Sequence, residues 1–150
     1  MIRPFEGSMD ILVKTYDVDF AGIVNNTVYV GWLDDLRQIV LDSPLPLQPL
    51  MEEHNAAPIV LETRITYHKA LRLFDQDVRA VMWVHAMDGV FFTTHSHILR
   101  GEELIAEAVQ RNAIVRMGRS LTPMRLPRSF RDAFKAYDYD PALTVSQSHF

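Results

Sequence analysis

Two aspartates and one asparagine near the start of the chain have the types and spacing of a reaction site. Asp17 and Asp19 follow a strand-like segment, and Gly22 permits a turn after them. An amphipathic helix is expected to begin near Asn26. A carboxylate can act as a nucleophile or a general base. The free N–H groups and positive dipole end of a helix N-terminus stabilise a developing oxyanion, so this stretch predicts carbonyl chemistry.

The two aspartates are not expected to work as a pair. We expect the side chains of Asp17 and Asp19 to point in opposite directions at the end of the strand, so that only one carboxylate faces the site. An isolated aspartate in such a place most often caps a turn. The glycine turn and helix start that follow favour Asp19 over Asp17 as the reactive one. Asn26 has the same alternative, a plain N-cap, although its backbone N–H can still donate to a substrate.

Other chemistries find little support in the sequence. Cysteine is absent, which excludes thiolate metal sites and cysteine nucleophiles. No G-x-S-x-G, G-x-G-x-x-G or P-loop motif occurs. If Asp88 and Gly89 form a two-residue hairpin turn, His85 lies on the opposite sheet face from His95 and His97. We therefore expect no metal and no other cofactor.

The remaining sequence predicts the elements that hold this site. Apolar residues at helical spacing predict a helix from Asn26 or Thr27 to Asp42, and Asp34 and Arg37 can pair on its polar face. Residues 1–150 are expected to form one α+β domain in which this helix packs on a five-stranded antiparallel sheet, with an ordered core at 9–137. The expected strands are 9–16, 59–69, 77–87, 90–99 and 104–117, the last three forming a meander, with short helices at 50–54 and after Ser129.

The charge and hydrophobicity of the chain limit which kinds of partner are expected. The net charge is −4, but residues 111–135 carry +6 and the rest of the chain −10. The basic segment favours an anionic partner, although a solvated basic face is an equal alternative. Aromatic residues are not interleaved with these bases, so nucleic acid is not expected. No apolar run of 18 residues and no signal peptide occur, so we expect a cytoplasmic protein without a membrane span.

The motif that opens the chain resembles a known family. Residues 16–29, Y-D-V-D-F-A-G-I-V-N-N-T-V-Y, followed by W-L-D-D-L-R, resemble the signature of hotdog-fold acyl thioesterases. The resemblance is to the 4-hydroxybenzoyl-CoA thioesterase type and its Tol-Pal-associated acyl-CoA relatives. It extends over about residues 9–135 through V-L-E, A-L-R-L-F-D-Q-D, G-E-E-L-I-A-E-A and P-M-R-L-P-R-S-F.

The resemblance implies a hotdog fold, hydrolysis of acyl-CoA or acyl-ACP, and a homodimer or homotetramer with active sites at subunit interfaces. It implies that Asp19 attacks the thioester or activates water. It also implies that the backbone N–H of Asn26 polarises the carbonyl. Residues near this turn are expected to contact the substrate: Gly22, Val24, Asn25 and Tyr29.

Departures from the family pattern leave alternatives open. Some relatives carry Tyr or His at the position of Asn26, and an Asn cannot take a proton. The pair Asn25–Asn26 is instead similar to plant acyl-lipid thioesterases, which suggests fatty acyl-ACP or β-ketoacyl substrates. The arginine-rich turn of the 4-hydroxybenzoyl-CoA enzyme is replaced by residues 87–90, so Arg125 and Arg128 are expected to bind CoA phosphates on charge alone.

Two other functions compete with hydrolysis. A non-catalytic protein that binds acyl-CoA or acyl-ACP needs no carboxylate, so Asp19 weighs against it. A hydroxyacyl dehydratase usually needs a histidine base, and the sequence has none close to this turn. The acyl chain is not identified, because five candidate tunnel residues are as readily core: Trp32, Met51, Trp83, Phe91 and Phe92.

Overall fold

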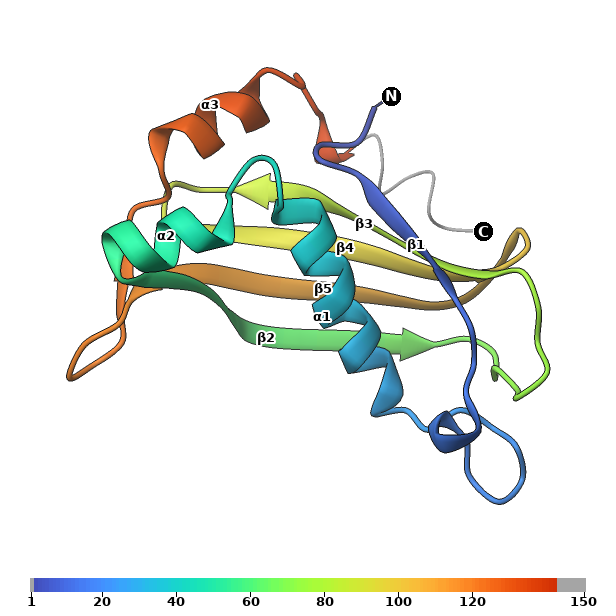
Figure 1. Cartoon of the computed structure of the whole chain (residues 1–150). Coiled ribbons are helices and arrows are strands. Elements are labelled where there is room, and N and C mark those ends of the chain that lie inside the picture. Colours follow the sequence, from blue (N-terminus) through green and yellow to red (C-terminus); the bar gives the residue numbers. More distant parts are fainter. Residues whose placement is uncertain (1, 143–150) are drawn as a thin grey trace.

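A long helix lies across one face of an antiparallel sheet in the computed structural model, which describes residues 2–142 (Figure 1). The strand order is β1-β3-β4-β5-β2, and β6 pairs with β5. This confirms the predicted α+β hotdog fold. The elements are β1 (Gly7–Ile11), a 3-10 turn η1 (Thr15–Asp17), α1 (Val28–Leu41), α2 (Leu47–His54), β2 (Ala56–Tyr67), β3 (Val78–Met87), β4 (Phe91–Arg100), β5 (Glu103–Arg116), β6 (Thr122–Met124) and α3 (Arg128–Lys135).

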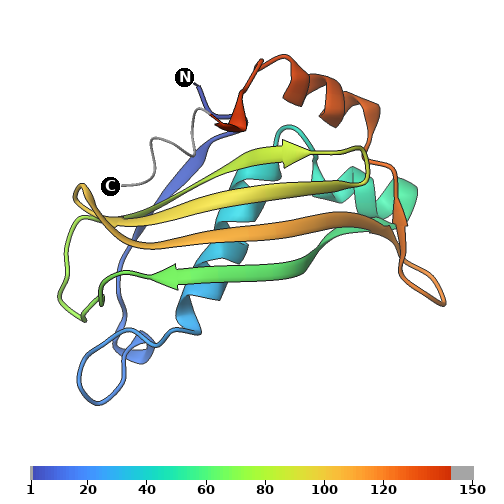
Figure 2. The same ribbon diagram turned by 180° about the vertical axis from the view of Figure 1, so that it is seen from behind.

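Helix α1 forms where its periodicity predicts it. Leu33, Leu36 and Val40 are buried along one stripe, each at no more than 4% exposure. Burying one such side chain contributes about 1.5–3 kcal/mol relative to leaving it exposed. Beside this stripe, Arg37 pairs with Asp34 at 2.6 Å, as expected from their spacing, and also donates to Gln110 of the sheet at 3.4 Å. The helix packs chiefly against β1 and β3, and β2 lies at the far edge of the sheet (Figure 2).

The N-terminal segment differs from the prediction. Residues 2–8 are not loose, because Pro4 accepts a hydrogen bond from the N–H of Val84 at 2.9 Å and Phe5 stacks on Phe130 at 5.6 Å. The strand expected at 9–16 begins earlier and ends at Ile11. It ends there because Ile11 pairs with Val78, the first residue of β3, and farther on the N–H of Lys14 donates to the Asp17 carboxylate at 2.9 Å.

The C-terminal third also holds elements that the periodicity missed. Strand β6 contains Pro123, which a short edge strand tolerates because it lacks only one N–H. Helix α3 begins at Arg128 after Pro127, so Ser129 is not its N-cap. The expected loose tail begins later than residue 138, since Tyr139 contacts His85 at 3.1 Å. Residues 143–150 of that tail lie outside the described part of the chain.

The hairpin between β3 and β4 corrects the predicted histidine arrangement. The Asp88 carboxylate accepts two backbone N–H groups, from residues 90 and 91, which lowers the pKa of Asp88 and moves the loop to residues 89–90. The pairing then shifts at a bulge around His85. His85 therefore stacks on His95 at 3.7 Å, on the same face rather than the opposite one. Burial chiefly lowers the pKa of His95 to about 4.

Two kinds of feature are absent from the described residues. Within residues 2–142, no group of three or more histidines, cysteines or carboxylates has an arrangement that could hold a metal ion. None of the helices there is long and apolar enough to cross a membrane.

Candidate active site

The predicted reactive stretch is a loop fixed against the segment that follows β2. The N–H of Val24 donates to the carbonyl of Leu71 at 2.9 Å, and the N–H of Leu73 donates to the carbonyl of Gly22 at 3.0 Å. Gly22 has a positive φ of 75°, which favours glycine. The loop projects from the lower right of the molecule in Figure 1, directly before α1. Two segments about fifty residues apart therefore shape the same site.

The two aspartates have different environments. Asp17 is buried at 7% exposure, and its carboxylate serves the turn at Lys14. Asp19 is exposed, and its Oδ1 accepts the N–H groups of Ala21 and Ile23 at 2.9 and 3.1 Å. Asp19 thus caps its own turn, as the simpler interpretation holds. Its Oδ2, however, has no hydrogen-bond partner among residues 2–142 and stays available to a substrate or water.

Two adjacent backbone N–H groups on the loop just before α1 are free. Between residues 21 and 28, hydrogen bonds engage the N–H groups of Ala21, Gly22, Ile23, Val24, Asn25 and Val28. The N–H groups of Asn26 and Thr27 have no acceptor in the part of the chain that the structure describes. The helix N-cap is Thr27, so the side chain of Asn26 does not cap the helix. These two donors sit at the positive end of α1, where an oxyanion is stabilised.

A pocket with a volume of about 270 Å³ opens beside these donors. It brings together three residues that the sequence singled out, Val24, Asn26 and Tyr29. The other wall comes from Ile23, from the last residue of β2 and from the three residues after it: Tyr67, His68, Lys69 and Ala70. Burial, with the nearby Tyr67 hydroxyl, raises the pKa of Tyr29 to about 12, so Tyr29 stays neutral. The pocket can hold a small neutral group next to free N–H donors.

The contribution of β2 was missed from sequence. Residues 67–69 precede the A-L-R-L-F-D-Q-D motif directly, and this proximity was the only local signal. His68 borders the pocket, which corrects the expectation that no histidine lies close to this turn. Its imidazole nevertheless turns toward Glu107, with 3.6 Å between Nε2 and Oε1. Since neighbouring side chains on a strand alternate, His68 points away from the face where Tyr67 meets α1.

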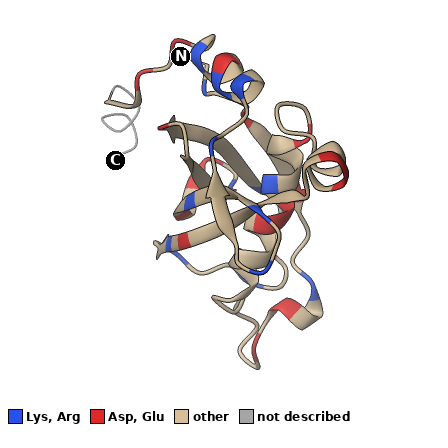
Figure 3. Cartoon of the chain, turned by 90° about the vertical axis from the view of Figure 1, so that its left-hand side faces the viewer, with Lys and Arg blue, Asp and Glu red and all other residues tan. Residues whose placement is uncertain are grey.

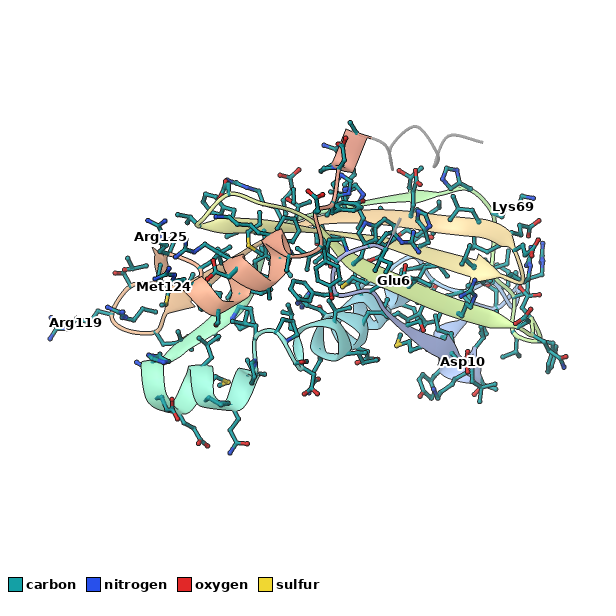
Figure 4. The ribbon with its side chains drawn as sticks, turned by 90° about the horizontal axis from the view of Figure 1, so that it is seen from above. Glu6, Asp10, Lys69, Arg119, Met124 and Arg125 are labelled. Carbon is teal, nitrogen blue, oxygen red and sulfur yellow. The ribbon has the colours of Figure 1, made fainter. Side chains whose placement is uncertain are left out.

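Two predicted residues lie at the other end of the molecule. Strand β6, next to Arg125, pairs with β5 at Ile114, whereas Tyr67 pairs with Ala106. Figure 4 shows Arg125 and the pocket residue Lys69 at opposite ends. Strand β2 alone spans 12 residues, roughly 35 Å. Figure 3 views the end of the molecule that carries α3 and β6. One chain therefore does not bring Arg125 or Arg128 to the pocket.

Comparisons with known proteins identify the family and the fold of the chain. A family model described as the Thioesterase-like superfamily matches residues 13–134. No curated protein sequence matches the chain. Solved structures share its fold at low sequence identity.

Three of these structures are thioesterases. A DHNA-CoA thioesterase from Staphylococcus aureus has a TM-score of 0.74 at 18% identity, covering 97% of each chain. A 1,4-dihydroxy-2-naphthoyl-CoA thioesterase from Synechocystis has a TM-score of 0.72 at 18% identity, covering 90% of this chain and 99% of the other. A thioesterase from Thermus thermophilus, complexed with coenzyme A and Zn, has a TM-score of 0.67 at 18% identity, covering 91% of this chain and 95% of the other.

Replacing Gly22 with alanine tests whether the loop depends on its backbone conformation. A Cβ at Gly22 meets nothing within 4 Å, so the cost is the positive φ alone, about 1–2 kcal/mol of unfolding free energy. Gly31 in α1 also has open space but carries no such φ. Gly31→Ala should therefore raise stability by about 0.5–1 kcal/mol. Urea unfolding of both variants measures the two changes in unfolding free energy. Equal changes would show that a side chain at residue 22 causes no backbone strain.

Proposed function

The chain belongs to the Thioesterase-like superfamily, which classes it with the thioester hydrolases, and from this we propose that it hydrolyses acyl-CoA to a free acid and a thiol through Asp19 and Asn26. One observation carries the proposal: on the loop that carries Asp19, the adjacent N–H groups of Asn26 and Thr27 are free, and Asn26 lines a pocket. A donor pair at a helix N-terminus suits the oxyanion of a tetrahedral acyl intermediate.

The proposed reaction divides the work between the two ends of this loop. The carbonyl oxygen of the thioester accepts the N–H of Asn26, with the adjacent N–H of Thr27 as the second donor, and removing one such donor typically costs about 2.7–4 kcal/mol of barrier stabilisation. Asp19 then acts in one of two ways. Its Oδ2 attacks the carbonyl carbon, forming an acyl-aspartyl anhydride that water hydrolyses, or it takes a proton from the attacking water. In both routes the C–S bond breaks and the thiolate leaves with the electron pair.

The substrate is held by the same short region. Gly22, Val24 and Asn25 supply the backbone beside the carbonyl, and Tyr29 lines the pocket. Coenzyme A is the favoured carrier, since the Thermus thermophilus structure is complexed with coenzyme A. Acyl-ACP is the alternative carrier, because the Asn25–Asn26 pair resembles that of plant acyl-lipid thioesterases. A cytoplasmic location stays a prediction from the sequence.

We also propose that a second copy of the chain pairs along β2, as the unit of a homodimer or homotetramer. Strand β2 is 12 residues long and lies at the sheet edge, with no partner on its outer side among residues 2–142. Leu61 and Tyr67 on it are 44% and 39% exposed. A long open edge of this kind invites pairing with another chain. In such a dimer Arg125 and Arg128 can reach the phosphates of coenzyme A only from the second subunit.

Asp19→Asn is the sharpest test of hydrolysis, because the amide oxygen still accepts the N–H groups of residues 21 and 23. The loop should stay folded while the carboxylate chemistry is lost. We expect kcat/KM to fall by roughly 10²–10⁴-fold in a thiol-release assay over short, long and aryl acyl-CoAs. Asp35→Asn changes an exposed aspartate of α1 and should have no effect. Wild-type rates in Asp19→Asn would refute the role of Asp19. Tight binding without turnover would favour the non-catalytic alternative.

Charge on the open edge tests the dimer. Leu61→Lys adds a charge to β2, and Leu47→Lys adds one to α2 at a similarly exposed site, 40% against 44%. Light scattering after gel filtration should give a multiple of 17.3 kDa for the wild type and for Leu47→Lys. Leu61→Lys should shift toward the mass of one chain. A wild-type mass of one chain would contradict the proposal.

A further inference from the structure

We infer that Tyr67 is a positioning residue for the oxyanion donors: its hydroxyl orients and polarises the peptide group that joins Asn26 to Thr27. The inference rests on the proposed thioesterase function and names a residue through which β2 acts on the reacting carbonyl. It follows from two contacts of Tyr67 and from one observation on the start of α1.

The first contact is a hydrogen bond at the start of α1. The hydroxyl of Tyr67 donates to the carbonyl oxygen of Asn26 at 2.9 Å. The same peptide group carries the N–H of Thr27, one of the two free donors. A hydrogen bond accepted at a carbonyl polarises its amide, so the N–H becomes a stronger donor in turn. The hydroxyl of Tyr67 therefore acts on the substrate through one peptide bond.

The second contact fixes the ring of Tyr67. Its edge meets Tyr29 with 5.0 Å between ring centroids and an angle of 81°. Tyr29 is 2% exposed and packs in the same edge-on way against Trp32 at 5.1 Å. Edge-to-face aromatic pairs prefer this geometry. Burial raises the pKa of Tyr67, so its hydroxyl keeps the proton that it donates.

The third observation is that the helix start is otherwise weakly held. Thr27 is the N-cap, but no side-chain capping bond forms there. The N–H of Val28 bonds to the carbonyl of Asn25 at 3.0 Å, which leaves the Asn26 carbonyl to Tyr67. Tyr67 belongs to the β2–β5 ladder, where it pairs with Ala106. The sheet thus sets the orientation of the peptide through this one hydroxyl.

Tyr67→Phe tests the inference because it keeps the ring against Tyr29 and removes only the hydroxyl. We expect kcat to fall about tenfold, the effect of one lost hydrogen bond, while KM stays within about twofold of wild type. Tyr16→Phe is the matched control. Tyr16 is 76% exposed, and its hydroxyl has no hydrogen-bond partner among residues 2–142.

A second readout avoids turnover. A ketone analogue of an acyl-CoA, with a methylene in place of sulfur and a ¹³C-labelled carbonyl, is bound to each protein. Its infrared carbonyl stretch should move to lower frequency on binding to the wild type and to Tyr16→Phe. The shift should be smaller in Tyr67→Phe, which loss of packing alone would not produce.

The outcomes separate the inference from the proposed function. A wild type that hydrolyses no acyl-CoA in the panel overturns both. A wild type that does hydrolyse them, with Tyr67→Phe equal in kcat and in carbonyl frequency, overturns only the positioning role. An increase confined to KM in Tyr67→Phe also overturns it. A fall in kcat together with the smaller frequency shift supports it.

Discussion

The site depends on the hydrogen-bond accounting of the chain between Asp19 and Val28. Backbone N–H groups at a helix start lack partners within the helix, whereas the loop residues before this helix bond to the turn, to Asp17 and to the segment after β2. That pairing consumes every N–H from residue 21 to residue 25. Among residues 21–28 it leaves the adjacent N–H groups of Asn26, which lines the pocket, and Thr27. Under the proposed function, these two unpaired donors are what the loop offers to a carbonyl oxygen.

The sheet supports this arrangement from below. Buried leucines hold α1 on β1 and β3, while β2 approaches the first turn of the helix through Tyr67. Asp19 uses one oxygen for the turn and keeps the other free, so the same residue shapes the loop and can react. These contacts hold the loop and the start of α1 in place beside the pocket. Arg125 lies at the opposite end of the molecule, next to the β6 residues that pair with the far end of β5.

Local patterns predicted much of this and missed what depends on distant contacts. The helix stripe, the β3–β5 meander and the residues of the loop follow from periodicity and turn chemistry. The predicted end of β1 was wrong because the strand stops where its partner begins: Ile11 pairs with Val78, the first residue of β3. The face of His85 was wrong because a single bulge shifts the register, which reverses every side chain beyond it. Tyr67 was missed because its role needs two segments about forty residues apart to meet.

The central claim is that a substrate carbonyl binds at the start of α1. A crystal structure of the Asp19→Asn protein with the unreactive ketone analogue of an acyl-CoA measures this directly. The account predicts the ketone oxygen within about 3 Å of the backbone nitrogen of Asn26, with the acyl group entering the pocket beside Tyr29. A ketone bound elsewhere, with the Asn26 and Thr27 N–H groups facing only water, would contradict it.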